Sequence, residues 1–197
     1  MKSEPWLAGW WQEIIAGQCR TALDIGANAG EWSQLLSPHF ETVVAVEPDD
    51  RQHVDAAYTC PNVIVERAAV YSHSGAGTLR QRTSTLQSSV ADAHPIGDAG
   101  RNVDVVCISR VQFVTMDDLL AKYSSVDFVK LDIEGGEVEA LRGARLQHWA
   151  GVRWLIESHN MTEAACLELA RIGFQRVEII RHPSPDAAPG HEWIWAH

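Results

Sequence analysis

The sequence predicts an α/β fold, in which an open, mostly parallel β-sheet has helices on both faces. Two of the observations behind this prediction lie in the first quarter of the chain. A glycine turn at residues 24–30 precedes a helix-like stretch at residues 31–36, and an apolar run at residues 43–46 ends in Glu47-Pro48. The third observation is the alternation of strand-like and helix-like segments that continues toward the C-terminus. Open α/β sheets with this succession bind a nucleoside at the carboxyl ends of their strands.

The residues of the glycine turn distinguish between cofactors. A dinucleotide fingerprint has glycines in the spacing G-x-G-x-x-G, but counting from Gly26 the second position holds Asn28 and the third holds Glu31. A carboxylate at this helix N-terminus would repel a pyrophosphate from the place where anions otherwise bind. S-adenosylmethionine (SAM) has no phosphate, and its amino and sulfonium groups would be attracted by Asp24. We therefore expect SAM as the cofactor; alternatively, Asp24 and the glycines only shape a turn.

Eight residues at the ends of the first three expected strands are candidates for cofactor binding. Gly26 and Gly30 let the backbone approach the methionine part of SAM closely, and Asp24 can accept a hydrogen bond from its amino group. Glu47 ends the second strand, where an acid can bind both ribose hydroxyls; its alternative role is that of a surface acid. The remaining candidates, which would brace the turn or lie beside the adenine, are Asn28, Glu66, Arg67 and Ala68.

The other elements are assigned in order along the chain. Residues 5–17 are expected to form a Trp-rich helix that packs on the sheet or covers part of the cofactor cleft. The alternating apolar residues at 63–70 predict a strand near the sheet edge. Thr115 and Asp118 form a capping-box pattern. Further strands are expected at residues 20–25, 42–47, 127–131, 152–157, 177–180 and 193–195. Further helices are expected at residues 50–58, 138–149 and 162–172, the last capped by Thr162 and ended by Gly173.

Residues 71–114 form a long excursion within what we expect to be one domain over residues 1–197. Ser, Gly, Thr and Gln dominate its first part, and short strands are expected at residues 103–108 and 111–114. A segment of this length inside a compact domain is more often functional than a passive connection. We therefore expect it to contain a functional loop.

Four motifs in this order resemble those of the FkbM family of methyltransferases. They are D-x-G-x-N-x-G at residues 24–30, Glu47-Pro48, V-K-L-D-I-E-G at residues 129–135 and L-R-G-A at residues 141–144. The likeness covers about residues 20–160. It implies a Rossmann-like class I methyltransferase with a seven-stranded sheet, whose one antiparallel strand is at residues 193–195. It also implies a hairpin and an acceptor-facing loop near residues 85–90.

Polar residues follow the fourth and fifth expected strands of the sheet. Asp132 and Glu134 follow the fourth, and Glu157 and His159 follow the fifth. Neighbouring parallel strands lie ~4.8 Å apart, so these residues can converge near the transferable methyl group. Oxygen ligands with one imidazole suit magnesium or manganese. We expect Asp132, Glu157 and His159 to bind a divalent ion that holds the acceptor hydroxyl, with Glu134 as a further ligand or as the general base.

Each of these candidates also has a structural interpretation. Glu134 and Glu137 open a helix, where acids interact favourably with the helix dipole by ~0.3–1 kcal/mol each. Asp132 could cap the same helix, and His159 could be a hydrogen-bonded loop residue. Lys130 belongs to the family pattern and shares a strand face with Asp132; it could orient the acceptor as part of the catalytic set, or only pair with the acids.

Composition excludes several partners. The net charge of −10 argues against nucleic acid, because binding depends on cationic neutralisation of phosphates. Arg80, Arg82, Arg101 and Arg110 could still form a local basic patch, or a solvated loop. No apolar run approaches the ~20 residues that span a membrane, and the start lacks a signal-peptide pattern. The four cysteines are widely separated and suit free thiols in a reducing compartment, so we expect a cytoplasmic protein without a membrane partner; a homodimer is left open.

Together these observations predict a SAM-dependent O-methyltransferase. The family that the chain resembles methylates polyketides, sugars and glycans, which implies a hydroxyl of a sugar, a polysaccharide or another small-molecule natural product as acceptor. Eight tryptophans, four of them expected around the cleft mouth, could stack on sugar faces, although Trp is more often a core residue. The alternatives are an N- or RNA methyltransferase and a non-catalytic module that binds SAM.

Overall fold

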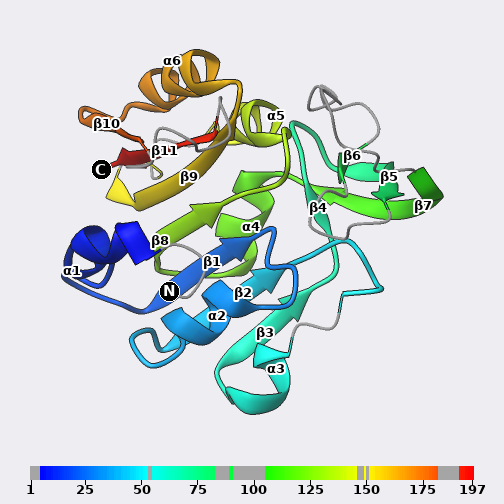
Figure 1. Ribbon diagram of the computed structural model, residues 1–197, viewed down its shortest axis with the longest axis horizontal. Coiled ribbons are helices and arrows are strands. Elements are labelled where there is room, and N and C mark those ends of the chain that lie inside the picture. Colours follow the sequence, from blue (N-terminus) through cyan, green and yellow to red (C-terminus); the bar gives the residue numbers. More distant parts are fainter. Residues whose placement is uncertain are drawn as a thin grey trace.

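The computed structural model describes residues 5–52, 55–82, 89–90, 105–145, 149, 151–181 and 191–197. Seven strands form the main sheet, in the order β10-β11-β9-β8-β1-β2-β3 (Figure 1). They are β1 (Thr21–Ile25), β2 (Thr42–Val46), β3 (Val63–Glu66), β8 (Val126–Leu131), β9 (Arg153–His159), β10 (Val177–Arg181) and β11 (His191–Ala196). β11 is antiparallel to both of its neighbours, and the other neighbouring pairs are parallel. The predicted sheet with one antiparallel strand is confirmed.

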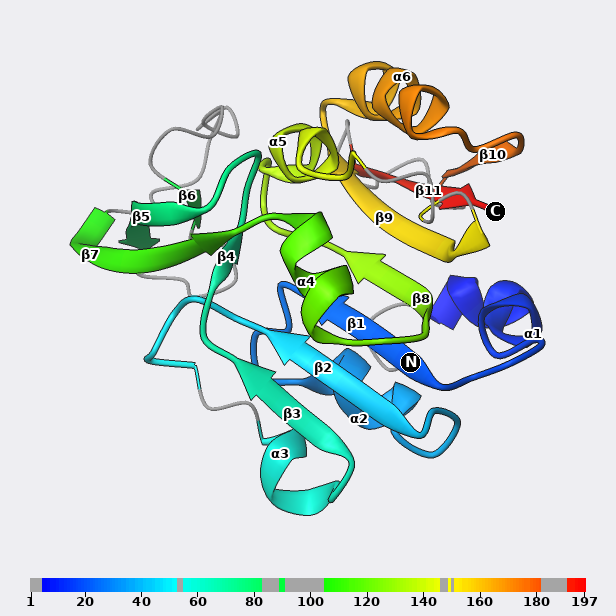
Figure 2. The same cartoon turned by 180° about the vertical axis from the view of Figure 1, so that it is seen from behind.

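Helices cover both faces of the main sheet, as predicted (Figures 1 and 2). One layer contains α4 (Met116–Lys122), α5 (Glu137–Arg142) and α6 (Thr162–Ile172). The other contains η1 (Pro5–Trp10), α1 (Trp11–Ile14), α2 (Glu31–Leu36) and α3 (Ala56–Thr59). Successive strand residues point to opposite faces, so Leu23 and Val44 pack in the core under the first layer, whereas Ala22 and Val43 pack under the second.

The expected single strand at residues 63–70 is wrong, because the chain leaves the main sheet in its middle. β3 lies at the sheet edge and ends at Glu66. The chain turns there, and the backbone N–H of Ala68 donates to the Glu66 carbonyl at 3.1 Å. Two residues, Ala69–Val70, then form β4 in a second sheet, where they pair with Phe113 and Val114. Apolar residues lie on both sides of Glu66-Arg67, and a charged pair also occurs within single strands, so the sequence pattern did not show the turn.

The second sheet, here called the arm sheet, has the order β4-β7-β5-β6. Its other strands are β5 (Gly75–Arg82), β6 (Ser89–Val90) and β7 (Val105–Val114). It lies on the side of the main sheet toward which β1 and β2 point (Figures 1 and 2). The two short strands expected at residues 103–108 and 111–114 are one continuous strand over residues 105–114, and most of the expected acceptor-facing loop lies outside the described residues.

Several helix boundaries differ from expectation. The expected helix at residues 5–17 is a 3₁₀-helix followed by one short α-helix. α5 ends at Arg142, well before residue 149, and a Cβ on the following Gly143 would lie 2.5 Å from the carbonyl oxygen of Tyr71. Thr162 is the first residue of α6 and not its cap, because its hydroxyl bonds Ser158.

Other local predictions are confirmed. The capping box of Thr115 and Asp118 is formed, and Gly173 ends α6 in the left-handed conformation. The described tryptophan side chains serve packing: Trp32 lies 6.0 Å from Trp193, measured between ring centroids, in the core under α2. No helix in the described ranges combines the length and the apolar character needed to cross a bilayer.

Candidate active site

The predicted glycine turn follows β1 and contacts the ends of both neighbouring strands. Gly26 (φ 77°) and Gly30 (φ 87°) have positive φ values, which residues with a side chain rarely adopt. The N–H of Gly26 donates to the Val46 carbonyl at the end of β2 at 2.9 Å. A Cβ at Gly26 would lie 1.7 Å from the carbonyl oxygen of Asp132. The turn therefore packs directly on the end of β8, and only glycine fits at this position.

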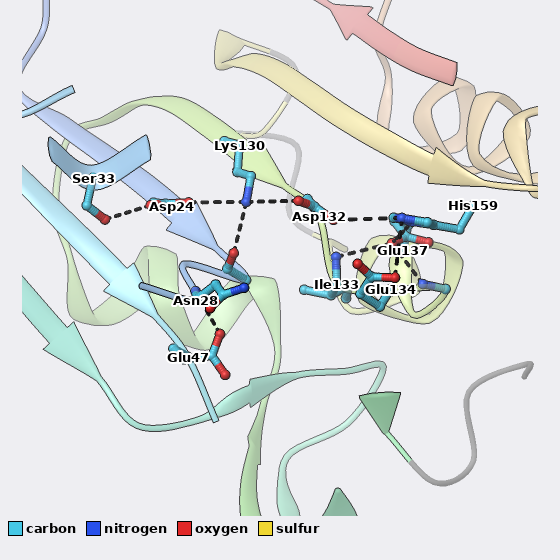
Figure 3. Close-up of polar contacts among 12 residues, drawn as sticks. Asp24, Asn28, Ser33, Glu47, Lys130, Asp132, Ile133, Glu134, Glu137 and His159 are labelled. Carbon is cyan, nitrogen blue, oxygen red and sulfur yellow. Dashed lines mark hydrogen bonds and ion pairs between the residues drawn. The ribbon is translucent and has the colours of Figure 1, made fainter. Parts of the chain in front are cut away.

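Lys130 in β8 lies between two carboxylates beneath this turn (Figure 3). Its Nζ is 3.4 Å from Asp24 Oδ1 and 3.3 Å from Asp132 Oδ2, and it donates to the Gly26 carbonyl at 2.9 Å. Burial alone would lower the pKa of Lys130, but the negative charges of Asp132, Asp24 and Glu157 raise it above its ordinary value. Lys130 thus stays charged and fixes the turn to the end of β8.

Asp24 is fully buried and has protein partners on both oxygens. Oδ2 accepts a hydrogen bond of 2.6 Å from Ser33 in α2, and Oδ1 faces Lys130. The side chain is 0% exposed. The predicted contact of Asp24 with the cofactor amino group stays a prediction, and the Asp24 charge acts on the neighbouring Lys130.

Glu47 follows β2 and is held by the backbone of two loops. Its Oε2 accepts from the N–H of Asn28 at 2.9 Å and its Oε1 from the N–H of Asp49 at 2.8 Å. Burial raises the pKa of Glu47, and the two hydrogen bonds oppose this shift. Asn28 has a φ of 49°, so the turn directs this N–H toward the carboxylate. Asn28 therefore braces the site through its backbone.

The three residues expected beside the adenine, Glu66, Arg67 and Ala68, have contacts that support the fold. The Glu66 carboxylate accepts from Lys122 Nζ at 2.5 Å and from the Tyr123 hydroxyl at 2.6 Å, which ties β3 to α4. Arg67 donates to backbone carbonyls of the loop that follows β2, and Ala68 is buried. The adenine-binding role of these residues stays a prediction.

A cluster of acids surrounds His159 at the ends of β8 and β9 (Figure 3). The imidazole is 1% exposed, and its Nδ1 lies 3.0 Å from Glu137 Oε1. Its Nε2 lies 3.7 Å from Glu134 Oε2 and 3.9 Å from Asp132 Oδ1. Glu137 also accepts from the backbone N–H groups of Ile133 and Gly135. Glu137 therefore holds both the ring and the loop that carries Glu134.

The environment raises the pKa values of His159 and Glu134. Burial lowers the pKa of His159, but the hydrogen bond and charge of Glu137, with the charges of Asp132 and Glu134, raise it to about 10. Burial is the largest cause that raises the pKa of Glu134 to about 8; His159 opposes this shift, whereas Asp132, Glu157 and Glu137 add to it. A carboxyl group with this pKa can carry a proton near neutral pH.

Glu137 is the site residue that sequence reasoning missed, because an acid at the start of a helix has a sufficient local explanation. Among the described residues, Asp132, Glu137 and His159 offer ligand atoms that lie within 4.8 Å of one another. This trio contains two of the predicted metal ligands. The third, Glu157, lies in β9, close enough for its charge to act on Lys130 and Glu134.

This strand order, with a glycine turn after the first strand and an acid after the second, defines a class I methyltransferase fold, which binds SAM. The chain belongs to the FkbM methyltransferase family: the model of the methyltransferase FkbM domain matches residues 24–176. No curated protein sequence matches the chain.

Solved structures agree with this fold. The methyltransferase FkbM of Methylobacillus flagellatus matches with a TM-score of 0.59 and 19% identity over 91% of this chain, which spans 44% of that protein. Precorrin 8W decarboxylase of Methanobacterium thermoautotrophicum matches with a TM-score of 0.54 and 14% identity, covering 98% of this chain and 90% of the other. The human methyltransferase 10 domain containing protein matches with a TM-score of 0.52 and 15% identity, covering 100% and 80%.

Proposed function

We propose that the protein transfers the methyl group of SAM to a hydroxyl oxygen of a sugar, a polysaccharide or another small natural product. The observation that carries this proposal is the cluster of Glu134, His159 and Glu137 beside the Gly26 turn. A hydroxyl has a pKa far above 7 and needs a base, a metal ion or both before it can attack. Membership of the family supports methyl transfer, and the resemblance supports this class of acceptor.

The residues around the turn fit SAM. The absence of a Cβ at Gly26 brings the backbone to the end of β8, where the methionine part would lie. Each oxygen of Glu47 accepts one backbone hydrogen bond, and a carboxylate oxygen can accept a second one. Glu47 can therefore bind the two ribose hydroxyls while the loops hold it in place. We assign Asp24 and Lys130 to the support and charge of the site.

Glu134 is the proposed general base. SAM supplies a methyl group on a good leaving group, so the protein has to align the acceptor and remove its proton. The acceptor oxygen attacks the methyl carbon, the carbon–sulfur bond breaks with its electron pair on sulfur, and the hydroxyl proton passes to Glu134. The pKa of about 8 makes this carboxylate a stronger base than an ordinary one. The positive charge of His159, whose Nε2 lies 3.7 Å from Glu134 Oε2, offsets the negative charge that develops on the acceptor oxygen.

Asp132, Glu137 and His159 could hold magnesium or manganese, and two of these residues belong to the predicted set of Asp132, Glu157 and His159. Carboxylate oxygens are the ligands that these ions prefer. A bound ion would lower the pKa of the acceptor hydroxyl. An imidazole has to be neutral to coordinate a metal, so the ion would compete with the proton that Glu137 and its neighbours hold on His159.

Transfer to an amine nitrogen is the second candidate function. Carboxylates outnumber cationic groups in this part of the site, which favours a positively charged acceptor. The acids are Asp24, Asp132, Glu134, Glu137 and Glu157, and the cations are Lys130 and His159. An ammonium acceptor would also need a base before it could attack, and Glu134 would again fill this role.

Incubation with methyl-labelled SAM and a panel of sugars, oligosaccharides and the corresponding amino sugars tests the proposal. Label on oxygen supports it, and label on nitrogen supports the second function. Binding of S-adenosylhomocysteine (SAH) without transfer to any acceptor would support a non-catalytic module. A parallel assay in excess chelator, followed by added magnesium, tests the metal: full turnover in chelator would remove it from the mechanism.

A further inference from the structure

One buried amide of the arm sheet has no role in the mechanism above. The Gln81 side chain in β5 is 4% exposed, although its cross-strand partner Cys107 in β7 is exposed. A buried amide is unfavourable unless it is hydrogen bonded. Gln81 Nε2 donates to Asp49 Oδ1 at 2.9 Å and to Asp50 Oδ1 at 3.3 Å. Gln81 therefore connects the arm sheet to the loop that follows β2.

Asp49 continues this connection to the predicted ribose-binding carboxylate. Its side chain is 1% exposed and is also held by Arg51, whose Nη2 lies 2.6 Å from Oδ2 and whose Nε lies 3.0 Å from Oδ1. The backbone N–H of Asp49 donates to Glu47 Oε1. Because Gln81 and Arg51 fix the Asp49 side chain, they restrict the direction of this N–H. A chain of hydrogen bonds thus runs from Gln81 through Asp49 to Glu47.

Arg67 holds the same loop from a second side. Its guanidinium donates to the carbonyls of Asp49 at 3.0 Å and Gln52 at 2.8 Å, and to that of Glu47 at 3.4 Å. Arg67 lies between β3 and β4, where the chain passes from the main sheet to the arm sheet. The loop that follows Glu47 is therefore hydrogen bonded to the arm sheet through Gln81 in β5. It is also hydrogen bonded to Arg67, which lies just before the first strand of that sheet.

We propose that Gln81 is a positioning residue for the cofactor: through Asp49 it holds Glu47 in the orientation that binds the ribose hydroxyls. The arm sheet is then part of the cofactor site. This inference rests on the proposed function, because it requires SAM to bind at Glu47. A merely structural role of Gln81 would anchor the arm sheet and leave cofactor affinity unchanged.

Gln81→Met removes the donor and keeps a side chain of similar length. We expect the Kd for SAH and the KM for SAM to rise about three- to tenfold, with a smaller effect on kcat, because the hydrogen bonds to Asp49 and Asp50 are lost at a distance from the ligand. Gln112→Met is the matched control, since Gln112 is exposed in β7 and its Nε2 donates to the carbonyl of the neighbouring Phe113 at 3.0 Å. The control is expected to change neither constant.

A double-mutant cycle with Glu47→Gln separates positioning from anchoring. If Gln81 acts through Glu47, Gln81→Met weakens SAH binding less in the Glu47→Gln variant than in the wild-type protein. Equal weakening in both backgrounds, or unchanged SAH affinity of folded Gln81→Met, overturns the inference. Should Gln81→Met not fold, Gln81→Asn, whose amide is too short to reach Asp49, is used with the same criteria. Failure of the wild-type protein to bind SAH would instead overturn the proposed function.

Discussion

The buried ammonium group of Lys130 lies 3.4 Å from an oxygen of the Asp24 carboxylate, and neither side chain is more than 2% exposed. Paired charges in such surroundings depend on each other, because removal of one leaves the other buried without compensation. Lys130 also bonds the Gly26 carbonyl. The pair therefore connects the first motif of the family pattern to the third.

Lys130→Met is expected to destabilise the protein by roughly 3–5 kcal/mol, since it leaves Asp24 without its counter-charge. Chemical denaturation measures this loss. Lys122→Met is the matched control, because Lys122 forms an ion pair with Glu66 but is 57% exposed, and exposed pairs contribute about 1 kcal/mol or less. Similar losses in the two variants would contradict the structural role given to Lys130.

Gly26→Ala is expected to prevent folding or to abolish SAH binding. The added Cβ would meet the Asp132 carbonyl, and the positive φ of this position is unfavourable for alanine. Gly151→Ala is the control, because a Cβ at Gly151 has no atom within 4 Å. Circular dichroism and SAH titration of both variants test the prediction; a Gly26→Ala protein with normal folding and affinity would disprove it.

Glu134→Gln is expected to lower kcat about 10²- to 10⁴-fold, the usual contribution of a general base, with little effect on SAH affinity. In the wild-type protein, activity should rise with pH up to about 8, as the base loses its proton. The rate–pH profile of the wild type and the residual rate of the variant check this assignment. A variant with wild-type kcat would exclude Glu134 as the base.

Stability is expected to fall as the pH rises through the range in which His159 loses its proton. The pKa of His159 is raised from 6.5 to about 10 in the folded protein, so its contribution is complete below pH 6.5 and is lost as the pH approaches 10. Glu134, with its pKa raised from 4.5 to about 8, adds a decrease that is complete near pH 8. Burial also raises the pKa of the Cys166 thiol above its ordinary value of 9.0, so a variant without the imidazole is needed to isolate His159 between pH 8 and 10.

Urea denaturation of the wild type and of His159→Gln at several pH values measures this effect. The difference in unfolding free energy between the two proteins should shrink from pH 8 to pH 10. A constant difference over this range would show that the imidazole is not held in its charged form by Glu137.

The sequence revealed those parts of the fold whose signals are local. Four features depend on residues that are close together in the chain. They are the glycine turn, the acid at Glu47, the helix over residues 31–36 and the capping box of Thr115. The turn at Ala68 could not be seen, because residues 69–70 pair with Phe113 and Val114, more than 40 positions away. Their apolar character is the same in either sheet.

The candidate site was likewise predicted in part. Asp132, Glu134 and His159 come together as their places at adjacent strand ends implied. The role of Glu137 could not be inferred, since its contact with His159 spans 22 positions. Glu66 was expected beside the adenine, but its carboxylate accepts a hydrogen bond from Lys122 in α4. Because Lys122 lies 56 positions away in the sequence, this structural role could not be inferred from the neighbours of Glu66.

The most direct test of the account is calorimetric titration of SAH into the wild-type protein and into Glu47→Ala. We predict measurable binding to the wild type and a loss of at least about tenfold in affinity for the variant, because hydrogen bonds to a charged acceptor contribute about 1.5–3 kcal/mol. Glu41→Ala, an exposed acid just before β2, should bind like the wild type. No heat with the wild-type protein, or equal affinity in Glu47→Ala, would contradict the account.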